Sequence, residues 1–168
     1  MHISQWYKCF ITKLSSARLS WENQDGVKMM KVVSLNNIDN LKPNAIKKVL
    51  EYSKAEFISS GNNLNFVLLD DDNNIIGEID YSYPLESVDL LYIFIDKEKR
   101  GNGYSKLLFN ESIKELKELN VKEIFLEVNV QNNVAKNLYE TLGFMMVGTR
   151  KKYYDDLYDA IIMKYVIR

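Results

Sequence analysis

Short runs of alternating apolar and polar residues dominate the chain from residue 28 onward, a pattern that predicts strands with one face buried. The expected strands cover residues 30–35, 64–69, 75–83, 88–95, 124–128, 144–150 and 160–167. The fourth of these is apolar or aromatic almost throughout, so we expect it at the centre of the sheet. Polar turns at 70–74 and 151–159, the second rich in tyrosine, predict two hairpins.

Other segments place apolar residues three and four positions apart, as amphipathic helices do. The expected helices cover residues 41–57, 107–119 and 132–142. Gly143 follows the last of them, at the position where glycine commonly ends a helix. The order β-α-β-β-β-α-β-α-β-β predicts an α/β (mixed α+β) domain, in which helices cover a mixed sheet.

The first 26 residues differ from the rest of the chain. No acidic side chain occurs from Met1 to Trp21, and several apolar residues would form one stripe on a helix. We therefore expect a helical N-terminal extension at 1–26 before a domain at 27–168. Because transit peptides are also poor in acidic residues, organelle targeting is the alternative to a helix that packs on the domain.

Charge and composition exclude several classes of function. The chain has 22 basic and 23 acidic residues and no long basic run, which argues against a nucleic-acid partner. One cysteine and one histidine exclude an internal disulfide, a cysteine-based zinc site and most histidine-dependent chemistry, so we expect no metal. No apolar run approaches the roughly 18 residues of a membrane span. We expect a cytoplasmic protein.

A glycine-bearing loop between the central strand and a helix is the first chemical signal. It reads Arg100-Gly101-Asn102-Gly103-Tyr104-Ser105-Lys106. Glycine permits sharp turns that expose main-chain amides, and a helix N-terminus adds unpaired N–H groups, so such a junction can hold a pyrophosphate. By itself this pattern fits a plain tight turn equally well. It lacks the arrangement of a dinucleotide fingerprint and the Gly-Lys-Ser/Thr of a Walker loop.

Two blocks of sequence resemble the GNAT N-acetyltransferase family. In the run 91–108, Arg100, Gly103 and Ser105 match the acyl-CoA signature Arg/Gln-x-x-Gly-x-Gly/Ala, with serine at its last place. The second block is Leu126-Glu127-Val128 followed by Asn132-x-x-Ala135-x-x-Leu138-Tyr139-x-x-x-Gly143-Phe144. The ending, Lys152-Tyr153-Tyr154 and Asp159-Ala160-Ile161-Ile162-Met163, is similar to the branch that acetylates protein N-termini, closest to the ribosomal-protein-alanine acetyltransferases.

The resemblance implies a GNAT fold, a mostly antiparallel sheet of about six to seven strands flanked by helices, and acetyl-CoA as co-substrate. The cofactor-binding residues that it implies are Ile93, Phe94, Ile95, Arg100, Gly101, Asn102, Gly103, Tyr104, Ser105, Lys106 and Asn132. The main chain of 93–95 would hold the pantetheine arm and polarise the thioester carbonyl.

The resemblance also assigns roles to four side chains. Glu127 would be the general base and Tyr139 the general acid, with Tyr153 and Tyr154 holding the substrate peptide. Each has a plainer alternative: a solvated glutamate on a strand, a core aromatic on a helix, and two turn aromatics that cover a sheet edge.

The acceptor amine is the most open part of the hypothesis. An α-amine has a pKa near 8, so roughly a tenth is neutral at pH 7, against 10⁻³–10⁻⁴ for a lysine. A single moderate base therefore favours a protein or peptide N-terminus. A small-molecule amine (polyamine, amino sugar or amino acid) or a lysine side chain is the alternative, and a non-catalytic acyl-CoA-binding domain is a third. The sequence leaves the oligomeric state open.

Overall fold

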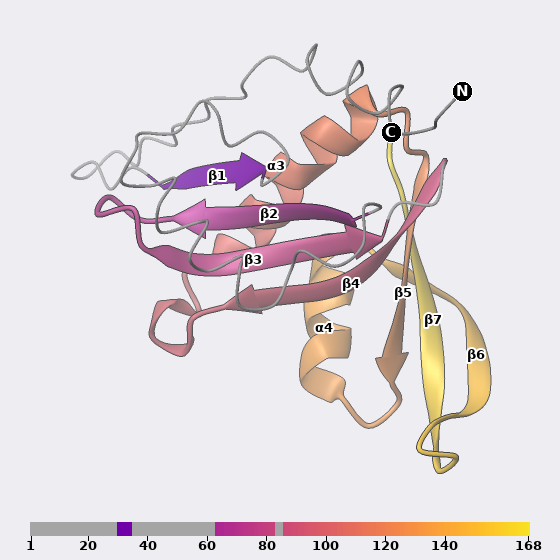
Figure 1. Cartoon of the computed structure of the whole chain (residues 1–168). Helices are drawn as coiled ribbons and strands as arrows, with labels where there is room; N and C mark the ends of the chain where they lie inside the picture. The colour runs from indigo at the N-terminus through magenta and orange to yellow at the C-terminus, as the bar shows by residue number, and fades with distance from the viewer. Residues whose placement is uncertain (1–29, 35–62, 83–85) are drawn as a thin grey trace.

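The computed structural model describes residues 30–34, 63–82 and 86–168, and within them seven strands form one sheet. The strands are β1 (Lys31–Ser34), β2 (Asn63–Leu69), β3 (Ile75–Ser82), β4 (Ser87–Ile95), β5 (Glu123–Asn129), β6 (Met145–Tyr154) and β7 (Tyr158–Val166). Their order in the sheet is β1-β2-β3-β4-β5-β7-β6 (Figure 1). Only β4 and β5 run parallel. The expected mixed, mostly antiparallel sheet is confirmed.

The last hairpin is longer than the sequence predicted. The expected turn at 151–159 is wrong, because β6 continues to Tyr154 and β7 begins at Tyr158. Tyrosines favour strands, and a bulge in β6 hides the alternation that would have shown it. The expected helix at 41–57 and the extension at 1–26 lie outside the described residues.

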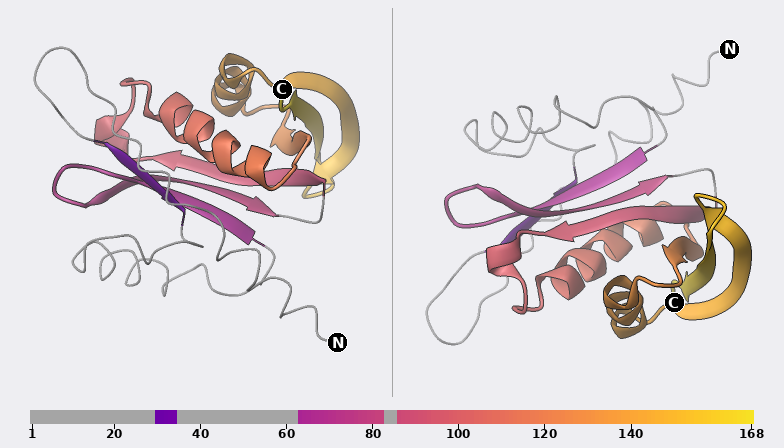
Figure 2. Two further views of the ribbon diagram at one scale, coloured as in Figure 1. Left: turned by 90° about the horizontal axis from the view of Figure 1, so that it is seen from above. Right: turned by 90° about the horizontal axis from the view of Figure 1, so that it is seen from below.

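Two helices cover one face of the sheet (Figure 2). They are α3 (Tyr104–Glu118) and α4 (Asn133–Leu142), and a short 3-10 helix, η2 (Lys97–Lys99), precedes α3. Leu108, Phe109 and Leu116 of α3 are fully buried against the sheet. Gly143 ends α4 with a left-handed φ of 97°, as expected. Neither helix is long and apolar enough to cross a membrane, and no other helix in the described ranges is either.

The sheet divides into two halves between β4 and β5. The two strands pair only at Ser87, Val88 and Asp89, which face Glu123, Ile124 and Phe125. Beyond these pairs the strands diverge, and β1–β4 run almost across β5, β7 and β6 (Figure 1). We call the gap between residues 90–95 of β4 and 126–129 of β5 the β4–β5 opening. Its edges carry main-chain groups that no strand in the described part of the chain takes up.

A buried carboxylate lies in the first half of the sheet. Asp80 of β3 is 3% exposed, and its Oδ1 accepts a hydrogen bond of 2.7 Å from Nδ2 of Asn65. Burial raises the pKa of Asp80 to about 7; the Asn65 hydrogen bond opposes the rise and neighbouring Glu78 adds to it. Since the charged form is disfavoured, Asp80 holds its proton more tightly in the folded protein than in the unfolded chain.

The free energy of unfolding should therefore fall as pH rises from about 4, the unfolded pKa, to about 7. Asp80→Asn keeps the shape and an acceptor for Asn65 and cannot ionise. We expect this variant to be roughly 2–4 kcal/mol more stable than the wild type at pH 8 and about equal at pH 4. Urea unfolding across this range measures the difference. Asp71→Asn, at an exposed turn position, is the control, and equal stability of Asp80→Asn and wild type at pH 8 would contradict the expectation.

Candidate active site

The loop before α3 exposes a series of main-chain N–H groups. Gly101 and Gly103 have left-handed φ angles of 78° and 77°, which glycine adopts without strain. Gly103 is the residue before α3 and makes no side-chain cap. None of the N–H groups of residues 101–106 has a hydrogen-bond partner in the described part of the chain. An anion is the natural partner for such a helix start.

Two side chains of this loop brace it from within. Nε of Arg100 donates to the carbonyl oxygen of Ile95 at 2.8 Å, and its guanidinium lies 5.6 Å from the Phe94 ring centre. Nδ2 of Asn102 donates to the carbonyl oxygens of Lys99 and Arg100 at 3.0 and 3.1 Å. These contacts give Arg100 and Asn102 a role in holding the loop's shape, while the exposed Lys97 and Lys106 keep positive charge beside it.

The free edge of β4 presents alternate residues to the β4–β5 opening. The Asp96 N–H donates to the carbonyl oxygen of Ile76, in the same register that pairs Ile95 with Gly77. Because bonded and non-bonded pairs alternate in an antiparallel ladder, Ile93 and Ile95 direct their N–H and C=O groups away from β3, into the opening. Phe94 is the exception among the three expected residues. Its main chain faces Glu78 of β3, so the geometry does not support a main-chain role for Phe94 at the cofactor.

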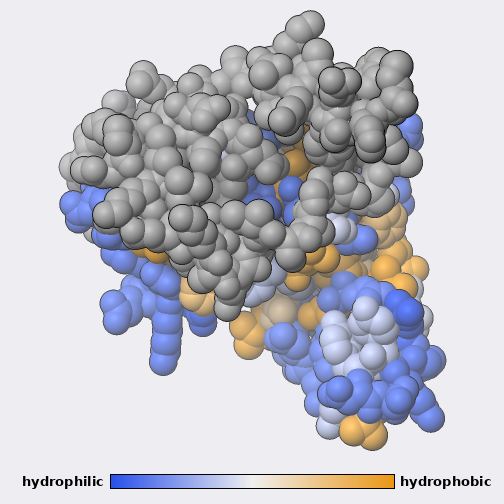
Figure 3. Space-filling view, in the orientation of Figure 1, coloured by the Kyte–Doolittle hydropathy of each residue, from blue (hydrophilic) through white to orange (hydrophobic). Residues whose placement is uncertain are grey.

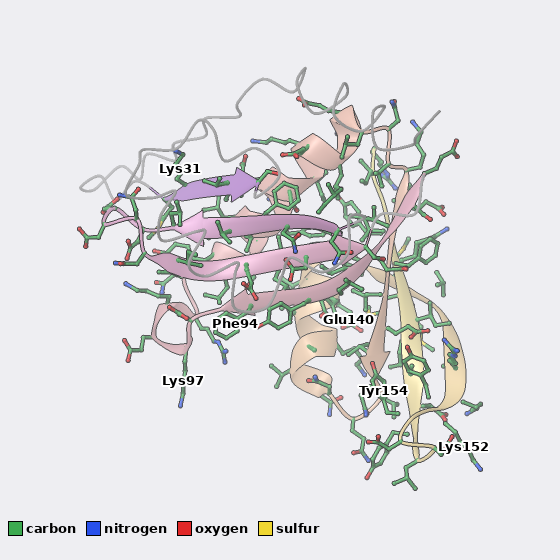
Figure 4. All side chains as sticks on the ribbon, in the orientation of Figure 1. Lys31, Phe94, Lys97, Glu140, Lys152 and Tyr154 are labelled. Carbon is green, nitrogen blue, oxygen red and sulfur yellow. The ribbon has the colours of Figure 1, made fainter. Side chains whose placement is uncertain are left out.

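The edge of β5 that faces the β4–β5 opening shows the same alternation of main-chain directions. The Val130 N–H donates to the carbonyl oxygen of Asp159, in the register that pairs Glu127 with Ile162. The main-chain groups of Glu127 and Asn129 therefore point into the opening. The hydroxyl of Tyr154 donates to the carbonyl oxygen of Glu127 at 3.2 Å. This contact brings the end of β6 to the opening, and Figure 4 shows Tyr154 beside the end of β5.

The side chain of Glu127 faces away from the helices. Buried residues alternate along β5, and Glu127 belongs to the partly exposed set, 28% exposed. Its Oε1 lies 3.2 Å from Nη1 of Arg150, whose guanidinium lies 4.4 Å from the Tyr153 ring centre. A hydrogen bond to Glu127, and then the charge of Glu127, raise the pKa of Tyr153. Glu127 is thus surrounded by Arg150, Tyr153 and Tyr154.

Tyr139 lies on α4, on the helix face that packs on the core. Its ring meets Phe144 edge-on at 5.8 Å. Burial first, and then the charge of Tyr154, raise the pKa of Tyr139, so its hydroxyl keeps its proton. The hydroxyl has no hydrogen-bond partner among the described residues, where no fully buried side-chain polar atom lacks one. The hydroxyl oxygen is therefore not fully buried.

The start of α4 is fixed by Asn132. Its Oδ1 accepts a hydrogen bond of 3.0 Å from the Ala135 N–H, which caps the helix. This leaves Nδ2 of Asn132 for another partner.

The structure brings Glu127, Tyr153 and Tyr154 together at the β4–β5 opening. Tyr139 is near enough to Tyr154 for the charge of Tyr154 to raise its pKa, so the expected acid lies in the neighbourhood of these residues. Sequence reasoning missed Arg150, because nothing local in an edge strand shows which residue it meets 23 positions away. Within the described ranges, no group of histidine, cysteine and carboxylate side chains could hold a metal ion.

Comparisons with known proteins agree with this geometry. A model of the acetyltransferase (GNAT) domain matches residues 32–166. The ribosomal protein bS18-alanine N-acetyltransferase of Haemophilus influenzae is 40% identical over 91 residues, which are 54% of this chain and 61% of that protein. The chain spans about two thirds or less of the length of the curated relatives that it matches.

Solved structures show the same fold. The ribosomal-protein-S18-alanine N-acetyltransferase from Escherichia coli superposes with a TM-score of 0.61 and 25% identity, over 83% of this chain and 94% of that one. A Bacillus anthracis structure assigned as a streptothricin acetyltransferase, in complex with acetyl coenzyme A, gives 0.60 and 28% identity over 68% of each chain.

Proposed function

Because the chain belongs to the GNAT acetyltransferase family, we propose that it transfers the acetyl group of acetyl-CoA to the N-terminal α-amine of a protein or peptide. One observation carries the proposal. N–H groups without a partner among the described residues lie at the start of α3, next to the end of β4. At the β4–β5 opening the Tyr154 hydroxyl binds the Glu127 carbonyl oxygen, and Tyr139 is near enough to Tyr154 for the charge of Tyr154 to raise its pKa.

The residues present fit acetyl-CoA, which supplies an activated acetyl group and a thiolate leaving group. The N–H groups of residues 101–106 bind its pyrophosphate, and nearby lysines add positive charge. Ile93 and Ile95 face the opening with main-chain groups, which hold the pantetheine arm and polarise the carbonyl. Since Arg100 already occupies the Ile95 carbonyl oxygen, the Ile95 N–H and both groups of Ile93 carry this role. Nδ2 of Asn132 is a further donor.

Proton transfers precede and accompany the reaction. Glu127 first takes a proton from the ammonium form of the amine, directly or through water, which leaves the nitrogen neutral. The nitrogen then forms a bond to the acetyl carbon as the carbon–sulfur bond breaks; Tyr139 gives its proton to the sulfur, and the acylated nitrogen loses its surplus proton to water. The raised pKa of Tyr139 keeps its hydroxyl proton in place at neutral pH.

Three observations favour an N-terminal amine as acceptor. The Haemophilus relative is named for its action on a ribosomal protein's alanine. Tyr153 and Tyr154 lie beside Glu127, where they can hold a peptide next to the base. A single base also suits an amine whose pKa is near 8. A small-molecule amine, which the likeness to the Bacillus anthracis structure favours, or a lysine side chain is the second candidate.

A peptide array with acetyl-CoA tests the proposal. Each peptide is offered with a free or a blocked N-terminus, both with an internal lysine, and spermidine and streptothricin are assayed beside them. We expect acetylation of free N-termini only. Acetylation of internal lysines alone, or of the small amines alone, would reject the N-terminal assignment. Binding of acetyl-CoA without turnover on any of these amines would reject catalysis.

A further inference from the structure

The strand β6 contains two surplus residues close to the site. Arg150 pairs with Ala160 and Tyr154 pairs with Tyr158, so three residues of β6 face Asp159 alone on β7. Such a bulge is unpaired along part of its length and needs other contacts to keep one shape. Lys152, in its middle, has a left-handed φ of 51°, which is strained for a residue with a side chain.

Asp159 supplies the missing contacts. Its Oδ1 accepts a hydrogen bond of 3.0 Å from the Lys152 N–H, and its Oδ2 lies 2.6 Å from Nζ of Lys151. Its own carbonyl oxygen accepts the Val130 N–H at 3.1 Å, just beyond the end of β5. The contact with Lys151 and the Lys152 N–H lower the pKa of Asp159, so the carboxylate is charged at neutral pH. One residue therefore connects the bulge to the strand that carries Glu127.

The bulge explains how two consecutive tyrosines reach one glutamate. In a regular strand neighbouring side chains point to opposite faces. Here the Tyr154 hydroxyl donates to the Glu127 carbonyl oxygen, while Tyr153 contacts the Glu127 side chain and Arg150. The two tyrosine rings meet edge-on at 5.0 Å.

We propose that Asp159 is a positioning residue for the acceptor: it holds the left-handed bulge at Lys152 and thereby keeps Tyr153 and Tyr154 at Glu127. This inference rests on the proposed function for the identity of the acceptor. The Lys152 N–H contact matters more than the ion pair, because Lys151 is 80% exposed and a pair in water contributes little.

Four variants separate these contacts. Asp159→Ala removes both, Asp159→Asn keeps the acceptor for the Lys152 N–H, and Lys151→Ala removes only the ion pair. Lys152→Gly, added to Asp159→Ala, lets the bulge take its left-handed conformation without strain. For Asp159→Ala we expect a KM for the acceptor peptide about tenfold higher, with the KM for acetyl-CoA unchanged. Asp159→Asn and Lys151→Ala should stay near wild type, and the added glycine should recover part of the loss.

Hydrogen exchange of the Lys152 amide gives a readout that does not depend on activity. It should be faster in Asp159→Ala than in wild type or Asp159→Asn. Faster exchange with an unchanged acceptor KM, or equal rises in both KM values, would overturn the positioning role while the proposed reaction stands. If the Lys152 amide of Asp159→Ala exchanged as slowly as in wild type, the positioning role would also be overturned. A wild type without turnover on any peptide would instead reject the proposed function.

Discussion

Replacing Tyr139 with phenylalanine is expected to lower kcat by about a hundredfold or more, the range of a lost general acid, while the Kd for acetyl-CoA stays unchanged. The ring would still meet Phe144, so only the hydroxyl is lost. Since burial raises the pKa of Tyr139 above its ordinary value of 10, the wild type should show no loss of kcat from this group as pH rises to 9. Steady-state kinetics and calorimetry measure both quantities.

Tyr165→Phe is the matched control for this experiment. Tyr165 packs on the same Phe144 ring, at 5.6 Å, and lies in β7. It should keep wild-type turnover. Equal turnover in Tyr139→Phe and wild type would remove Tyr139 from the role of acid and leave it as a core aromatic.

Replacing Glu127 with glutamine is expected to lower kcat/KM for a peptide by about a hundredfold at pH 7. Glutamine has nearly the same shape but cannot accept the proton of the amine. The neutral fraction of an α-amine rises from roughly a tenth at pH 7 to about nine-tenths at pH 9. The deficit of the variant should therefore shrink over this range, and a pH profile of kcat/KM for both proteins measures it.

Glu123→Gln provides the comparison. Glu123 lies on the same strand and face, four residues earlier, and pairs with Lys164 at 3.0 Å as Glu127 pairs with Arg150. Glu123→Gln should have the same kcat/KM as wild type at every pH between 7 and 9. If Glu127→Gln had no deficit, or a deficit as large at pH 9 as at pH 7, the glutamate would not be the base.

The strands, both described helices and the glycine-bearing loop before α3 could be predicted because their signals are local. Apolar spacing identified α3 and α4, and the glycines before α3 predicted a sharply turning loop, which the left-handed φ angles of Gly101 and Gly103 confirm. Glu127 was expected to face away from the aliphatic residues of its strand, and it does. Its catalytic role, like that of Tyr139, remains a prediction.

Other parts of the site depend on strand pairing, which sequence periodicity does not encode. Whether Phe94 turns its main chain to β3 or to the opening depends on which pairs of the ladder are bonded. The Arg150–Glu127 contact needs the register of β5, β7 and β6. The two surplus residues before Tyr154 break the alternation that would have predicted a longer strand.

The surface of the β6–β7 hairpin varies in hydropathy along its length. Its end is mostly hydrophilic, whereas orange surface lies above it (Figure 3). Met145, Met146 and Val147, in the first half of β6, are each more than half exposed.

The β4–β5 opening also bears on the stability of the protein. A linear molecule that carries amide groups can bind in this gap as an extra strand would. A ligand that binds only the folded chain shifts the folding equilibrium toward the folded state. A ligand at a hundred times its Kd adds about 2.7 kcal/mol. If acetyl-CoA is that ligand, as proposed, the folded fraction of the protein would rise with the concentration of acetyl-CoA.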